Sequence, residues 1–149
     1  MHALCLVAAL VAGFALPFQA AANATLGRHT PTLFHAALVN FVVGGVVLLV
    51  LALASPSKGG WSWATLGQAP WWGWIAGLIG AGYVAMTVKG APVLGAVLML
   101  AAATAGQMAG SIAVDHFGLM GMVRRPLSLE RSMGMVLLVG GVVLILRGR

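Results

Sequence analysis

The chain has 149 residues, of which 61% are hydrophobic and only 7% are charged. A soluble domain carries about 25% charged residues, so this composition excludes a soluble globular protein and predicts an integral membrane protein. The formal net charge of +6 does not indicate nucleic-acid binding, because the basic residues are scattered at the ends of apolar segments, where they would contact lipid phosphates.

Five apolar segments are each long enough to cross the bilayer, since a spanning helix needs about 20 mostly apolar residues. The predicted helices lie near residues 3–26, 33–53, 71–88, 93–114 and 132–146. Gly27, Arg28 and Pro31 end the first segment. Residues 89–92 read Lys-Gly-Ala-Pro and are expected to separate the third helix from the fourth, because glycine and proline interrupt helices. The chain is therefore predicted to be a single all-α transmembrane domain, with almost nothing outside the bilayer.

Small residues recur at helical spacing in the last three segments. They are Gly73, Gly77, Gly80 and Gly82, then Ala102, Gly106 and Gly110, then Gly134, Gly140 and Gly141. Patterns of this kind let helix backbones approach closely in lipid, where there is no hydrophobic drive for association. We therefore expect most of these positions to pack against a neighbouring helix.

The basic residues are divided evenly between the two sides of the membrane. With five helices, the N-terminus and the second and fourth loops share one side, and the first and third loops and the C-terminus share the other. The first side carries Lys58, Arg124, Arg125 and Arg131, and the second carries Arg28, Lys89, Arg147 and Arg149. Because Lys/Arg asymmetry sets orientation, a chain without it is expected to insert in both orientations and to pair with an inverted copy of itself.

The chain contains no long internal repeat. Many transporters are built from two inverted repeats, with the substrate site at the interface between them. One such repeat is present here, so the second has to come from another chain.

Polar side chains inside the apolar segments are candidates for lining a cavity, because they are costly in lipid and usually face a partner or water. The candidates are Gln19, Asn23, Asn40, Tyr83, Thr104, Gln107 and Ser111. Gln19 lies roughly 10 Å from the second-side end of its predicted helix, and Gln107 lies roughly 10 Å from the first-side end of its own. In an inverted pair, Gln19 of one chain therefore falls at the depth of Gln107 of the other. The alternative, that these amides only bridge helices, stays open.

Three ionisable residues are candidates for coupling or for a contact between chains. Inversion places Asp115 of one chain on the side of Arg28 of the other, so an ion pair between them is one hypothesis, and a solvated helix-end carboxylate is the other. His35 is a candidate for proton coupling because an imidazole titrates near neutral pH, although a histidine at a helix start is often only an interfacial residue. No Asp or Glu lies inside a predicted span, which argues against a strictly cationic substrate exchanged for protons.

The sequence shows no carboxylate pair, metal-ligand cluster or nucleophile–base set, so we expect no enzyme, metal site or cofactor. The one cysteine, Cys5, allows no intrachain disulfide.

Several stretches resemble one family. They are Gln19 to Arg28, Pro70 to Trp74, Ala91 to Gly95, Asp115 to Leu119, Arg125 to Ser128, and then Arg131, Gly134 and Gly140 to Val142. Together they are similar, over the whole chain, to the small five-helix YdcZ-type proteins, inner-membrane exporters of the drug/metabolite transporter superfamily. The resemblance implies half of a ten-helix inverted-repeat transporter in a bacterial inner membrane. It maps the family's first-helix amides onto Gln19 and Asn23, and its Asp-His motif onto Asp115 and His116. The proton-coupling glutamate of the superfamily's shortest branch has no counterpart in the first helix.

The sequence therefore predicts an exporter of a small polar or amphipathic metabolite that works by alternating access in a dual-topology antiparallel homodimer. Two alternatives remain. One is a dual-topology ion channel, and the other is a subunit of a heteromeric transporter with an oppositely oriented partner.

Overall fold

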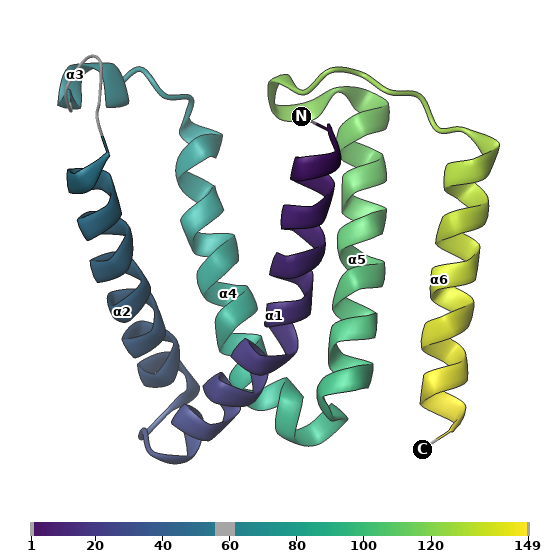
Figure 1. Cartoon of the computed structure of the whole chain (residues 1–149), viewed down its shortest axis with the longest axis horizontal. Coiled ribbons are helices and arrows are strands. Elements are labelled where there is room, and N and C mark those ends of the chain that lie inside the picture. Colours follow the sequence, from purple (N-terminus) through teal and green to yellow (C-terminus); the bar gives the residue numbers. More distant parts are fainter. Residues whose placement is uncertain (1, 56–61, 149) are drawn as a thin grey trace. The chain divides into compact units, whose positions relative to one another are not determined.

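The structure, a computed structural model, describes residues 2–55 and 62–148, and all the regular secondary structure in these residues is helical. Five long helices are each long and apolar enough to cross a membrane, as predicted (Figure 1). They are α1 (His2–Arg28), α2 (Leu33–Ala54), α4 (Trp71–Leu94), α5 (Ala96–Phe117) and α6 (Leu129–Arg147). Two short helices, α3 (Trp63–Leu66) and η1 (Leu119–Gly121), lie in loops. Of the basic residues counted above, Lys58 and Arg149 lie outside the described residues.

The predicted boundary between the third and fourth spans is wrong. Helix α4 continues through Pro92 and ends at Leu94, and the chain turns at Gly95, which has a φ of 74°. The helix tolerates Pro92 because the backbone hydrogen bond that proline removes is one of the last in α4. The turn is made at Gly95 because only glycine readily adopts a positive φ. Lys89 is thus part of α4, about 8 Å before its end. A lysine side chain can extend over that distance to the interface, so the predicted division of charge between the two sides is unchanged.

The chain forms two compact units, one of residues Ala22–Lys89 and one of residues Met1–Ala21 with Gly90–Arg149. In the first unit, Ala37, Val84 and Ala85 form a small buried cluster, against which Leu33 and Tyr83 pack. This cluster joins the beginning of α2 to the C-terminal half of α4.

A buried polar contact joins α1 to α4 in the same unit. The Asn23 side-chain amide donates a 2.9 Å hydrogen bond to the Thr87 hydroxyl oxygen, and that hydroxyl donates in turn to the Val84 carbonyl at 2.7 Å. Asn23 and Thr87 are 3% and 2% exposed. The contact is therefore shielded from both lipid and water, and it holds two neighbouring helices together.

In the second unit, α5 and α6 form an antiparallel pair connected by residues 118–128. Leu98 and Met99 are buried near the start of α5, and the Met99 sulfur lies close to Gly90. Most other apolar side chains of both units are exposed, including all those of residues 2–15, 41–54 and 71–79. These surfaces are available to lipid or to another chain.

Most of the recurring small residues do not pack against another described helix of the same chain, so their packing against a neighbouring helix stays a prediction for a second chain. A Cβ atom would meet nothing within 4 Å at Gly73, Gly77, Gly82, Gly106, Gly110, Gly134, Gly140 and Gly141. Gly80 does lie against a side chain, that of Phe41. Helical spacing identifies a face of small residues but does not tell whether that face meets a helix of the same chain.

Gly27 is the closest glycine contact between helices in the Ala22–Lys89 unit, because a Cβ atom there would collide with Val88 Cγ1. Val88 is buried and its β-branched side chain has little rotamer freedom. We expect Gly27→Ala to destabilise the protein by about 1–3 kcal/mol, measured by thermal unfolding of purified protein in detergent. The control Gly77→Ala meets no atom and should be neutral or slightly stabilising. Val88→Ala should restore much of the loss in the Gly27→Ala background, and no recovery would contradict the packing explanation.

Candidate functional site

A groove of about 410 Å³ runs between α5 and α6. Its lining residues are Thr104, Met108, Ser111, Ile112 and Asp115 of α5 and Arg131, Gly134 and Leu138 of α6. The α5 residues recur at intervals of three or four and therefore share one helix face. At 1.5 Å per residue, the groove extends from Asp115 to Thr104 over about 17 Å. This is more than half of a hydrocarbon core about 30 Å thick.

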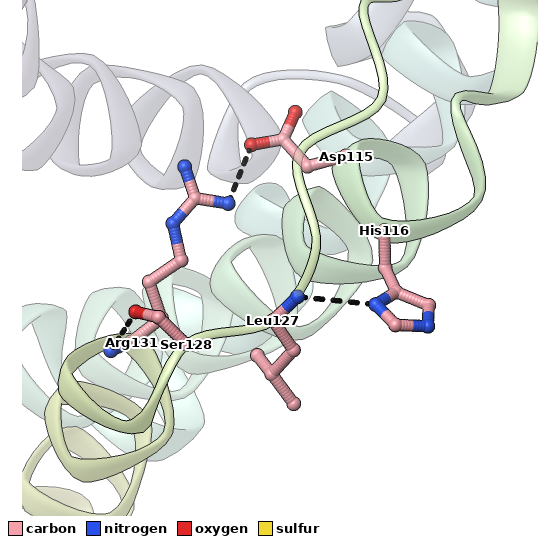
Figure 2. Close-up of polar contacts among 5 residues, drawn as sticks. All are labelled: Asp115, His116, Leu127, Ser128 and Arg131. Atoms are coloured by element: carbon pink, nitrogen blue, oxygen red, sulfur yellow. Dashed lines mark hydrogen bonds and ion pairs between the residues drawn. The ribbon is translucent and has the colours of Figure 1, made fainter.

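An ion pair lies at the loop end of this groove. Arg131 Nη1 and Asp115 Oδ2 are 3.2 Å apart (Figure 2), and the side chains are 36% and 29% exposed respectively. An ion pair as exposed as this contributes little to stability, about 0–1 kcal/mol.

The loop after α5 folds back onto the last turn of that helix. The Arg125 backbone N–H donates to the Asp115 carbonyl at 2.7 Å, and Arg124 Nε donates to the His116 carbonyl at 3.0 Å. These carbonyls have no partner within the helix, because the last four of any helix do not. The Leu127 N–H donates to His116 Nδ1 at 3.1 Å (Figure 2).

These contacts show how residues 115–118, Asp-His-Phe-Gly, connect α5 to the loop that follows it. The Asp115 side chain contacts α6, and the His116 ring accepts a hydrogen bond from the loop. The Phe117 ring packs edge-on against His116, with ring centroids 4.8 Å apart. Gly118 ends α5 in the left-handed conformation, with a φ of 64°. The segment thus sets the path of the chain from α5 to α6 and with it the position of Arg131.

Gly118 carries two separate constraints. Its φ is positive, and a Cβ atom would lie 3.3 Å from both Arg124 Cβ and the Met122 carbonyl oxygen. Gly121 also has a positive φ, of 78°, but a Cβ there would meet nothing within 4 Å. Both alanine variants should lose about 1–2 kcal/mol for the left-handed backbone, and Gly118→Ala should lose more. Thermal unfolding and hydrogen exchange of residues 118–128 measure the difference, and equal losses would show that the loop can move away from the added methyl group.

Three predicted residues, Thr104, Ser111 and Asp115, come together in the groove. The partner of Asp115, Arg131, was not a predicted site residue, although it stands on the same side of the membrane in the sequence-based topology. The predicted pair between Asp115 and Arg28 of an inverted copy involves a second chain and stays a prediction. In one chain Arg28 is exposed, and its Nη2 lies 3.5 Å from the Thr25 hydroxyl.

The two glutamines do not join the groove. Gln19 and Gln107 are both exposed, and neither side chain has a hydrogen-bond partner among residues 2–55 and 62–148. Gln107 lies beside the groove-lining face of α5 and not on it. In a bilayer such amides require a polar partner from outside these described residues.

The remaining predicted residues lie in the Ala22–Lys89 unit. Asn23 bridges α1 and α4 through Thr87, which was not among the candidate site residues. Asn40 and Tyr83 are half-buried. His35 is exposed at the start of α2, with Nδ1 2.7 Å from the hydroxyl of Thr32, the residue that caps the helix. Within the described part of the chain, no three His, Cys, Asp or Glu side chains are close enough to hold a metal.

Comparison with known proteins identifies one family for this chain. Residues 4–144 match the model of the family described as "Putative inner membrane exporter, YdcZ". The Inner membrane protein YdcZ of Escherichia coli (strain K12) is 28% identical over 138 residues, which cover 93% of this chain and 91% of the relative. No solved structure matches the chain. The relative's name and the five apolar helices place this protein in the inner membrane, as a multi-pass protein. Because the family match covers almost the whole chain, the protein belongs to the YdcZ family of inner membrane exporters.

Proposed function

We propose that this protein exports a small polar or amphipathic metabolite by alternating access, as an antiparallel homodimer of chains inserted in both orientations. The observation that carries the proposal is the α5–α6 groove, which has a charged pair at its loop end and hydroxyl groups further along its length. A path that a polar molecule can follow through lipid requires polar groups at several depths. The groove supplies them over more than half of the hydrocarbon core.

A second copy of the chain in the inverted orientation would complete a path across the membrane. The charged end of the groove lies beside the fourth loop of its chain, so in an inverted chain it lies at the opposite side of the membrane. Two such grooves give one access route from each side of the membrane, which is the arrangement found in inverted-repeat transporters. The even division of basic residues permits both orientations.

The positions of the exposed glutamines support the same pairing. With the observed helix ends, Gln19 lies about 14 Å from the end of α1 at Arg28, and Gln107 lies about 15 Å from the end of α5 at Phe117. In an inverted pair, Gln19 of one chain and Gln107 of the other therefore remain at nearly the same depth. We assign the two amides to the wall of the central cavity.

Flux into vesicles that contain the purified protein tests the proposal. We expect saturable uptake of at least one compound from a panel of small metabolites, measured with and without a pH gradient. Flux that does not saturate and that passes inorganic ions would instead favour a channel. Saturable flux in native membranes that is lost on purification would favour a heteromeric transporter.

A further inference from the structure

We propose that the α5–α6 groove binds a zwitterionic molecule with an apolar body, by placing its ammonium group on Asp115 and its carboxylate on Arg131. This inference rests on the proposed function, because it takes the groove to be the substrate site. It goes further by naming the charge pattern of the substrate.

The geometry of the ion pair leaves hydrogen-bonding groups available on both partners. Arg131 donates to Asp115 through Nη1 alone, and the contact reaches one carboxylate oxygen, Oδ2. Within residues 2–55 and 62–148, Asp115 Oδ1 and the Nε and Nη2 atoms of Arg131 have no hydrogen-bond partner. Figure 2 shows the second carboxylate oxygen turned away from the guanidinium group. A ligand can therefore use an acceptor and donors that lie side by side.

The charges that line the groove favour a ligand with both signs. Asp115 and Arg131 are the charged side chains in the lining, and together they sum to zero. A simple anion that binds Arg131 would be repelled by Asp115, and a simple cation that binds Asp115 would be repelled by Arg131. Because like charges at short range oppose binding, a molecule with an ammonium group beside a carboxylate satisfies both side chains at once.

The rest of the lining suits an apolar body. Met108, Ile112 and Leu138 supply apolar side chains beyond the ion pair, and Gly134 leaves space because it has no side chain. Ser111 and Thr104 add hydroxyl groups along the same face of α5. A volume of about 410 Å³ lies within the range of pockets that hold small organic ligands.

Three ligands that differ only in charge test the proposal. They are L-leucine, 4-methylpentanoate, which lacks the ammonium group, and 3-methylbutylamine, which lacks the carboxylate. Equilibrium binding is measured with purified wild-type protein in phosphatidylcholine nanodiscs. We expect L-leucine to bind at least about tenfold more tightly than either analogue, because each charge-assisted hydrogen bond contributes a factor of this size. Equal binding of the three compounds, or no binding of L-leucine, would overturn the proposal.

Substitutions separate recognition from a structural role. Asp115→Asn should weaken L-leucine binding at least about tenfold and leave 4-methylpentanoate unchanged or tighter, whereas Arg131→Gln should weaken both. The matched control is Glu130→Gln, which removes a carboxylate adjacent to Arg131 but outside the groove lining. It should leave all three affinities unchanged. If Asp115→Asn weakens the three ligands equally, the pair only holds α5 and α6 together. The wild-type ranking does not depend on any variant being folded.

A lipid headgroup is another source of the same charge pattern. The binding measurements are repeated with half of the phosphatidylcholine replaced by phosphatidylethanolamine, whose ammonium group can donate hydrogen bonds. Unchanged L-leucine affinity supports a soluble ligand, and competitive loss would assign the groove to the lipid. Vesicle flux separates the two proposals: saturable transport of compounds that are not zwitterions would remove this inference alone. L-leucine binding with no flux of any compound would remove the proposed export instead.

Discussion

Replacing Gln19 or Gln107 by leucine should reduce transport about a hundredfold while the dimer persists. Each substitution removes an amide from both symmetric halves of an inverted pair, because each half contains one Gln19 and one Gln107. A lost hydrogen bond to a group that has no water to replace it costs about 1–3 kcal/mol, and two such losses correspond to about a hundredfold. Flux into vesicles measures the effect, and cross-linking in the same vesicles measures the dimer.

The control is Gln68→Leu, which changes an exposed glutamine outside the five long helices and should leave transport unchanged. Unchanged transport in both Gln19→Leu and Gln107→Leu would show that these amides do not form the cavity wall. Loss of the dimer together with transport would show that they join the two chains and do not contact the substrate.

The five spanning helices could be predicted from the sequence because length and apolar composition alone decide whether a segment can cross a bilayer. The exact break between α4 and α5 could not. Residues 89–92 contain both glycine and proline, yet the turn is made at Gly95, where the backbone needs a positive φ. A proline in the last turn of a helix and a proline just after it look alike in sequence.

The part of the candidate site that lies on one helix could be predicted, because helical periodicity decides which residues share a face. Thr104, Ser111 and Asp115 stand seven and four residues apart, so one face of α5 had to carry all three. Their partner across the groove, Arg131, depends on how the loop of residues 118–128 returns the chain. That path is set by contacts such as Leu127 to His116, which no periodicity reveals. Thr87, the partner of Asn23, was missed for the same reason, since the two are 64 residues apart.

Two lysines added after the C-terminus should fix the chain in one orientation and reduce flux at least about tenfold. In the sequence-based topology the wild-type chain has four basic residues on each side, so the addition makes the ratio six to four. The side with more Lys and Arg stays in the cytoplasm. Because the wild-type chain has no excess on either side, even a small excess of basic residues should decide its orientation. Chains in one orientation cannot form an inverted pair, and the second access route is lost. Labelling of a cysteine placed in the second loop reports the orientation, with Cys5 changed to alanine.

The same reasoning predicts rescue by a second variant with the opposite bias. Two lysines inserted beside Lys58, on the first side, should fix the chain the other way up and also reduce flux. Co-expression of the two variants supplies both orientations and should restore flux to near the wild-type level, because the transporter then reassembles from oppositely oriented copies. Two serines at the same C-terminal position are the control for added length and should change neither orientation nor flux. Full activity of either lysine variant alone, with one orientation established by labelling, would refute the antiparallel homodimer. Inactive variants with no rescue would point to a different partner chain.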